Sequence, residues 1–194
     1  SNTLTLTGTP AAVSAYLDTA THIQYTGALN DNGSPAATIA VSYKDSAMGS
    51  FQALGSAIAV NITAVNDAPV IASPATAATL PGVHEDEGSA TNTGASVNSL
   101  FAPRFTDVDS GATMSGIVVV GNASTSTEGA WEYSTDSGTS WLAIGAVSAS
   151  SGLALSSTTQ LRFAPAKDWS GTPGALTVKL LDNTQASFTS GATQ

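Results

Sequence analysis

The feature that most constrains the fold of this chain is the alternation of apolar and polar residues with a period of two. Segments with this pattern recur along the sequence and are separated by turn signals such as Asp31-Asn32-Gly33 and Asp136-Ser137-Gly138. Such a period places alternate side chains on opposite faces of a half-buried β-strand. The strands predicted in this way are Leu4–Leu6, Ile23–Tyr25, Ile39–Tyr43, Ile58–Ile62, Ile117–Val119, Leu161–Phe163 and Leu176–Leu180.

One segment instead has a helical pattern. Pro10 to Asp18 carries apolar residues three and four positions apart, Thr9 is a suitable N-cap, and Pro10 suits the first helical position. We expect one short crossover helix there. The spacing of strands and turns otherwise predicts an all-β chain, an antiparallel β-sandwich rather than a β/α fold.

Composition excludes several classes of function. The 194 residues carry a formal charge of -9 and no cysteine. A negative surface repels phosphates, so we expect no nucleic-acid partner. Without cysteine there are no disulfides and no thiol catalysis. No run approaches the ~20 apolar residues that span a bilayer, so we expect no membrane insertion.

An internal repeat divides the chain. Ile39–Asp45 superposes on Leu176–Asp182 at a constant offset, and upstream Ile23 and Tyr25 match Leu161 and Phe163. The two copies are cut differently, which indicates a repeat of about 140 residues. We therefore predict that residues 1–67 are the C-terminal part of one repeat and residues 68–194 most of the next.

The incomplete first copy predicts exposed strand edges. A half-sandwich leaves backbone groups and an apolar face unpartnered, and such edges favour strand swapping or aggregation. We expect the missing strands to come from another segment, from a second molecule by strand-swapped self-association, or from packing against residues 70–194.

The junction Val65-Asn66-Asp67-Ala68-Pro69 resembles the V-N-D-A-P linker between cadherin-like, immunoglobulin-type tandem repeats of large bacterial surface adhesins, including RTX adhesins. Three further motifs resemble that family: the D-x-D-x-G loop at Asp107–Gly111, the acidic run Glu85–Glu87, and the late-strand Leu181-Asp182. The resemblance covers most of residues 53–194. It implies a Greek-key sandwich, neighbouring repeats of the same chain as partners, and a secreted, cell-surface role in cell adhesion and biofilms.

These acids also have a meaning of their own. Asp107 and Asp109 lie two apart, so on extended backbone both carboxylates point the same way. Asn66 and Asp67 add two more oxygen atoms that can bind a metal ion. Ca²⁺ takes about six to eight oxygen ligands. The metal ligands predicted here are Asn66, Asp67, Asp107, Asp109, Glu85, Glu87, Asp182 and Asp45. The alternative is that these residues form Asx turns and a solvated loop, and for Asp45 and Asp182 the two alternatives are equal.

A second motif, Ser134-Thr-Asp136-Ser-Gly138-Thr-Ser140-Trp141, resembles the Asp-box hairpin that repeats in sialidases as a structural element. We expect Asp136 to bond the turn backbone and Gly138 to have a positive φ. Trp131, Trp141 and Asp136 are also candidates for binding a glycan or protein ligand, because exposed tryptophan rings stack on sugars. The alternative for the tryptophans is the sandwich core.

No nucleophile–base arrangement or HExxH motif occurs, so the sequence does not indicate an enzyme. The function that we expect is a calcium-stabilised extender repeat of a secreted bacterial adhesin, with Ca²⁺ as its cofactor. One alternative is a glycan- or protein-binding module that uses tryptophan-bearing loops, with a host or biofilm ligand. A weaker alternative is a fragment of a sialidase-like hydrolase.

Overall fold

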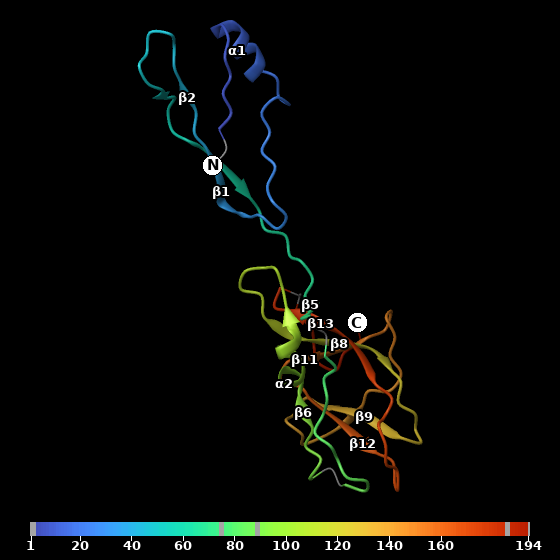
Figure 1. Ribbon diagram of the computed structural model, residues 1–194. Coiled ribbons are helices and arrows are strands. Elements are labelled where there is room, and N and C mark those ends of the chain that lie inside the picture. The colour runs from blue at the N-terminus through green and yellow to red at the C-terminus, as the bar shows by residue number, and fades with distance from the viewer. Residues whose placement is uncertain (1–2, 74–75, 88–89, 185–186, 194) are drawn as a thin grey trace. The chain divides into compact units, whose positions relative to one another are not determined.

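The computed structural model describes residues 3–73, 76–87, 90–184 and 187–193. It divides into two compact units, Ser1–Val65 (unit 1) and Asn66–Gln194 (unit 2), shown in Figure 1. Their boundary lies within the V-N-D-A-P segment. The described secondary structure consists mostly of short strands in small antiparallel sheets, with two short α-helices, so the chain is of the all-β class.

Unit 1 contains one helix and two strand pairs. Strand β1 pairs with β4 and β2 pairs with β3, both antiparallel. The bounds of the elements are α1 Pro10–Leu17, β1 Gly33–Ile39, β2 Ser42–Tyr43, β3 Gln52–Ala53 and β4 Ile58–Ile62.

Helix α1 confirms the expected helix. Thr9 is its N-cap, and the Thr9 hydroxyl accepts a hydrogen bond from the Ala12 amide at 3.3 Å. Pro10 stands in the first turn, where its missing N–H would have no intrahelical partner. None of the helix residues is buried, so local capping rather than a core stabilises this helix.

Unit 2 contains two larger sheets. The strand order is β10-β9-β12-β6 in the four-stranded sheet and β11-β8-β13 in the three-stranded sheet, and β5 pairs with β7 separately. The bounds are β5 Val70–Ile71, β6 Ala95–Ser96, α2 Val97–Phe101, the 3₁₀ helix η1 Ala102–Arg104, β7 Phe105–Thr106, β8 Met114–Asn122, β9 Gly129–Ser134, β10 Leu142–Ala143, β11 Leu153–Ser156, β12 Gln160–Pro165 and β13 Leu176–Asp182.

One hydrophobic cluster joins both sheets of unit 2 with helix α2. Ile117 and Val119 of β8 and Leu155 of β11 are completely buried, and Leu161 of β12 is 2% exposed. The buried members of the cluster are Val97, Leu100, Ile117, Val119, Tyr133, Ile144, Leu153, Leu155 and Leu161. Because these side chains come from two sheets and a helix, their burial holds the three elements together.

The predicted strands form where a neighbouring strand is available. Leu161–Phe163 lies in β12 between β9 and β6, whereas its repeat-equivalent Ile23–Tyr25 is not a strand. The strand predicted at Leu4–Leu6 is also wrong. Extended backbone needs partners for its N–H and C=O groups, and in the described part of unit 1 only β1 to β4 pair with one another. The remaining predicted strands lie in or overlap β1, β2, β4, β8 and β13.

Helix α2 was not predicted. It is only five residues long and carries Asn98 and Ser99 beside its apolar residues. Its sequence signal is Ser96, whose hydroxyl accepts the Ser99 amide at 3.1 Å as an N-cap. Val97 and Leu100 from this helix enter the core.

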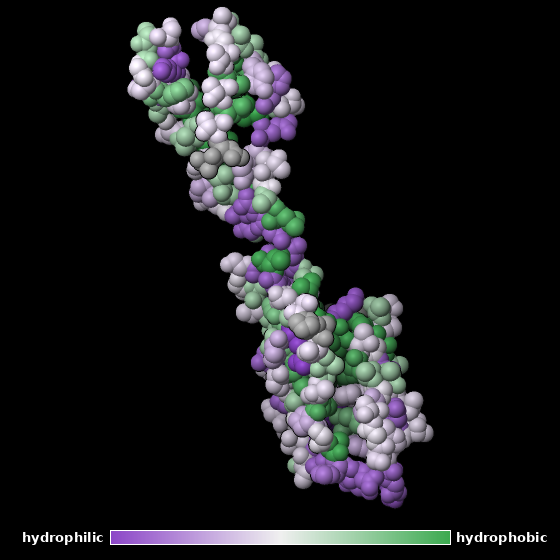
Figure 2. Space-filling model, viewed as in Figure 1, coloured by the Kyte–Doolittle hydropathy of each residue, from purple (hydrophilic) through white to green (hydrophobic). Residues whose placement is uncertain are grey.

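Unit 1 has no core of its own. No residue between 3 and 65 is buried, and apolar residues reach its surface in Figure 2. The large apolar side chains that are more than a third exposed there are Leu4, Leu6, Tyr16, Leu17, Ile23, Tyr25, Leu29, Val41, Tyr43, Phe51, Leu54, Ile58 and Val65. Unit 2 therefore supplies the buried apolar surface of the described chain.

Truncating a core leucine in unit 2 will destabilise that unit strongly. Leu155→Ala removes a completely buried side chain and should lower the free energy of unfolding by about 2–5 kcal/mol. All three tryptophans, Trp131, Trp141 and Trp169, lie in unit 2, so denaturation followed by tryptophan fluorescence reports on it. Leu142→Ala is the control, because Leu142 is 56% exposed. Equal losses in the two variants would contradict this core.

Candidate functional site

Five of the predicted ligands meet in one group, here called the linker cluster: Asn66, Asp67, Asp107, Asp109 and Asp182, the last residue of β13. The Asn66 side-chain amide donates to Asp182 Oδ2 at 3.2 Å. The Asp67 backbone amide donates to Asp109 Oδ2 at 2.7 Å, and the Asp109 amide donates to Asp107 Oδ1 at 2.9 Å. Residues from three distant parts of the sequence thus converge within unit 2.

Strand pairing explains this convergence. Strand β5 follows the linker and pairs with β7, so Val70 lies opposite Thr106, directly before the Asp107 loop. Strand β13 pairs with β8, so Asp182 lies opposite Met114, just after that loop. The cluster therefore forms where two pairs of strands end.

Asp182 anchors the cluster from inside the unit. It is completely buried, and its Oδ1 accepts the Thr184 amide at 2.8 Å. Its backbone carbonyl accepts the Ser115 hydroxyl at 2.6 Å. A carboxylate is buried at acceptable free energy only when several donors surround it, and Asn66 is one of those donors.

One oxygen of the cluster has no donor. Asp107 Oδ2 is buried and makes no hydrogen bond with the described residues. An unsatisfied buried oxygen costs about 1–3 kcal/mol, and more when it is charged. A cation would remove that cost, and the carboxylate and amide oxygens of the cluster are the kind of ligand that Ca²⁺ prefers.

The carboxylates nonetheless point largely to hydrogen-bond donors. In the described part of the chain, no three His, Asp or Glu side chains are arranged to hold a metal ion. Asp109 and Asp182 each use one oxygen for a donor from the linker. The residue types of the cluster therefore fit calcium, while their present geometry is a hydrogen-bonded one.

Asp45 forms an Asx turn in unit 1. Its Oδ1 accepts the amides of Ala47 and Met48 at 2.7 and 3.0 Å. Asp182, at the equivalent position of the repeat, likewise accepts the amide two residues later with its Oδ1. The two copies thus share a local turn as well as a sequence pattern, and both acids have the turn geometry that was one of the two alternatives.

The structure does not join Glu85 and Glu87 to the linker cluster by any described hydrogen bond. Glu87 Oε2 accepts the His84 amide at 3.0 Å. Asp86 Oδ1 accepts the Asp168 amide at 3.2 Å. In Figure 1 this loop lies at the end of unit 2 away from β5.

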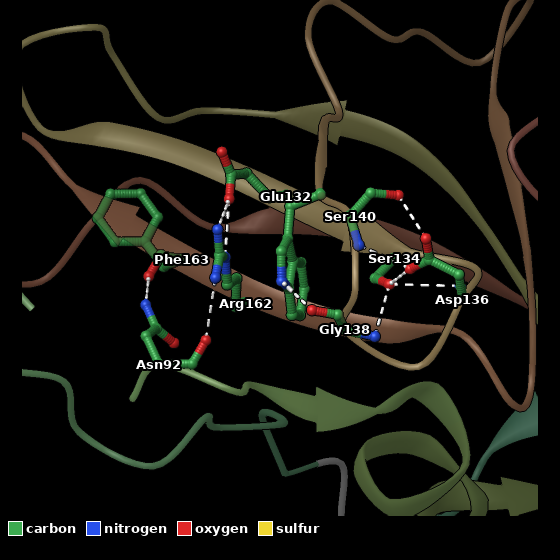
Figure 3. Close-up of polar contacts among 9 residues, drawn as sticks. Asn92, Glu132, Ser134, Asp136, Gly138, Ser140, Arg162 and Phe163 are labelled. Carbon is green, nitrogen blue, oxygen red and sulfur yellow. Dashed lines mark hydrogen bonds and ion pairs between the residues drawn. The ribbon is translucent and has the colours of Figure 1, made fainter. Parts of the chain in front are cut away.

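The Asp136 hairpin has the geometry expected of an Asp-box (Figure 3). Asp136 Oδ1 accepts the Ser134 hydroxyl at 2.7 Å and the Ser140 amide at 2.9 Å. Gly138 has φ of 89°, a conformation that glycine adopts without strain. Hydrogen bonds from the hydroxyl and amide of Ser140, and from the Ser134 hydroxyl, lower the pKa of Asp136 to about 2.

Both candidate tryptophans use their ring N–H groups inside the protein. Trp131 donates to the Gly174 carbonyl at 2.8 Å and packs edge-on against Phe163 at 5.4 Å between ring centroids. Trp141 donates to the Gly138 carbonyl at 3.1 Å, and its ring lies 4.0 Å from the Arg162 guanidinium carbon. Both side chains therefore help to hold unit 2 together.

Arg162 is the centre of a buried network that the sequence analysis missed. Its exposed fraction is 6%, and its Nε and a terminal nitrogen both lie 2.7 Å from Glu132 Oε2 (Figure 3). It also donates to the Asn92 carbonyl at 3.1 Å. The signal was the opposite charge of two residues that face each other across β12 and β9, which becomes visible only when the register is known.

Comparison with known proteins adds no relative. Neither a family model, nor a curated protein, nor a solved structure matches this chain. None of the helices in the described ranges has the length and apolar character needed to cross a membrane. Support for a function therefore comes from the chemistry of the chain's own residues.

Removing the Ser140 hydroxyl should raise the pKa of Asp136 from about 2 toward 3.8, because that hydroxyl is the largest cause of the depression. The measurement is an NMR titration of the Asp136 carboxyl in Ser140→Ala. Thr139→Ala is the matched control, because the Thr139 hydroxyl bonds the Asp136 backbone carbonyl and not its carboxylate. Equal pKa values in both variants would contradict the assignment.

The same shift predicts how acid affects the hairpin. The pKa of Asp136 is lower in the folded chain than the ordinary 3.8, so its contribution to stability is complete above pH 3.8 and is lost as the pH falls toward about 2. The protection of the Gly138 and Ser140 amides against hydrogen exchange, measured relative to the unfolded chain, should fall over that range. Asp136→Asn should remove this pH dependence.

Proposed function

We propose that this chain is a calcium-stabilised structural repeat, an extender segment of a secreted bacterial cell-surface adhesin, with no catalytic role. The observation that carries the proposal is the linker cluster, in which the buried Asp107 Oδ2 has no described donor. Hydrogen bonds already bring Asn66 and Asp67 of the linker to Asp182 and Asp109. A ligand-binding role receives less support, because Trp131 and Trp141 use their ring N–H groups internally.

Calcium would be held by oxygen atoms of the linker cluster. Asp107, Asp109 and Asp182 supply carboxylates, and Asp67 and Asn66 add oxygens from the linker. When bound, the ion supplies positive charge that balances carboxylates crowded into one place. Extracellular modules of this kind bind calcium at about 10⁻⁴–10⁻³ M, so the site suits a calcium-rich exterior.

Fixing the linker to unit 2 is the mechanical consequence. In the absence of the ion, mutual repulsion of the carboxylates weakens the contacts of Asn66 and Asp67. With the ion bound, the segment Asn66–Val70 is tied to the body of unit 2 at the ends of β5 and β13. A row of such units then acts as a stiff spacer whose partners are the neighbouring repeats of the same chain.

The proposed fold of unit 2 is an antiparallel Greek-key sandwich of the cadherin-like type. Support comes from the single hydrophobic cluster shared by its two sheets. The V-N-D-A-P linker and the D-x-D-x-G loop support the adhesin assignment, since both supply members of the linker cluster. Secretion to the cell surface follows from that assignment.

Calcium should stabilise unit 2. At about 10 mM Ca²⁺, a site with a dissociation constant near 1 mM adds about 1.4 kcal/mol to the free energy of unfolding. Denaturation followed by tryptophan fluorescence, with and without a chelator, measures this gain. Limited proteolysis should slow within Asn66–Val70 when calcium is present.

Asp107→Asn combined with Asp109→Asn should abolish the calcium effect on both measurements. Glu85→Gln combined with Glu87→Gln is the charge-matched control and should keep the effect, because those acids are not joined to the linker cluster. If the stability and proteolysis of the wild-type chain do not respond to calcium, the proposal is wrong. Equal loss of the calcium effect in the two double variants would show a general effect of charge instead.

A further inference from the structure

One edge of strand β13 has no partner strand among the described residues. It is the terminal strand of the sheet β11-β8-β13, so β8 occupies one of its edges. The chain that follows does not return along the other edge, because Gly191 and Ala192 instead bond Ala154 of β11. Within the described ranges no strand pairs with that second edge.

The backbone groups that face this free edge can be identified. The Ala123 amide donates to the Ala175 carbonyl at 3.0 Å, so Ala175 faces β8 with its backbone. Because successive residues of a strand alternate between its edges, Thr177 and Lys179 also face β8. The N–H and C=O groups of Leu176, Val178 and Leu180 therefore face the free edge.

The equivalent edge is occupied in the first copy of the repeat. Val41 is the repeat-equivalent of Val178, and its carbonyl accepts the Leu54 amide at 2.8 Å. Tyr43, the equivalent of Leu180, lies opposite Gln52 of β3, and Ile39, the equivalent of Leu176, lies opposite Ile58 of β4. The segment β3–β4 therefore pairs in unit 1 with the pattern that β13 leaves open in unit 2.

We propose that the free edge of β13 binds the β3–β4 segment of a second copy of this chain, by antiparallel strand pairing. The docking edge consists of the outward backbone groups of Leu176, Val178 and Leu180. The partner strand is residues 52–62, which already pair with the matching sequence pattern in their own unit. Main-chain hydrogen bonds provide the contact and the shared pattern provides the register.

Burial favours the exchange. In unit 1 the side chains of Leu54 and Ile58 are 61% and 57% exposed, and that unit contains no buried residue between 3 and 65. On β13 the side chains of Leu176, Val178 and Leu180 pack against the core of unit 2. A strand that leaves unit 1 for β13 thus gains contact with a packed core, which its own unit does not offer.

Sedimentation velocity on the full chain, from about 10 µM to about 1 mM, should show a concentration-dependent dimer. Val178→Pro removes an outward N–H, and proline is tolerated on an edge strand when its N–H position faces away from the ladder. It should weaken dimerisation at least about tenfold. Val178→Ala loses side-chain volume but keeps the N–H, so it should still dimerise. Tryptophan-monitored denaturation of both variants verifies that unit 2 is folded.

A synthetic peptide with the sequence of residues 50–62 tests the pairing directly. It should shift the amide NMR signals of Val178 and Leu180 in the full chain and should dissociate the dimer. Methylating the peptide nitrogen of Leu54, the donor to Val41 in unit 1, should abolish both the NMR shifts and the dissociation of the dimer. Methylating the nitrogen of Ala53, which alternation places on the opposite edge, should not.

Each of the following results would overturn the proposal. If the chain stays monomeric while the peptide binds, the occupant of the edge is not a second copy. If both methylated peptides bind, or both Val178 variants lose the dimer, backbone pairing at this edge is wrong. All measurements are made with calcium and with a chelator, so a failure here is separate from a failure of the calcium site.

Discussion

The rest of unit 2 depends on the pairing of β8 along both of its edges. Because β11 and β13 satisfy its backbone groups, β8 can bury Ile117 and Val119 completely in the cluster that it shares with the other sheet and with α2. The pairing with β13 also brings Asp182 close to the loop that precedes β8. The core and the linker cluster thus have the same origin. Unit 1 pairs its strands only two by two, and it buries no residue between 3 and 65.

Charge burial in unit 2 follows one rule. Arg162 lies between Glu132, the Asn92 carbonyl and the Trp141 ring, and Asp182 is surrounded by donors from Thr184 and Asn66. In each case at least one partner comes from a distant segment, so the buried charge ties that segment to a strand. Asp107 Oδ2 departs from the rule because it is buried without a described donor. That departure makes the linker cluster the natural place for a cation.

Local signals predicted local structure well. The cap at Thr9, the turn at Asp136–Gly138 and the alternation in β8, β12 and β13 each depend on a few adjacent residues, and each appears as predicted. The resemblance to cadherin-like repeats grouped Asn66 and Asp67 with Asp107 and Asp109, and hydrogen bonds join Asp67 to Asp109 and Asp109 to Asp107. Ile23–Tyr25 failed as a strand because its pattern is correct but no neighbour pairs with it. Arg162 and Glu132 were missed because charges 30 residues apart become partners only through strand register.

The sequence by itself determined the strand class, the repeat and the position of the linker, because periodicity and turn residues act over a few positions. Tertiary structure alone decided which strands find partners, which charges are buried and which edge stays open. Those outcomes depend on pairing between distant segments, where hydrogen bonds and burial act together. Ile39–Asp45 and Leu176–Asp182 carry the same pattern, yet the first pairs with the segment that follows it and the second with β8. The difference lies in the neighbours that each unit provides.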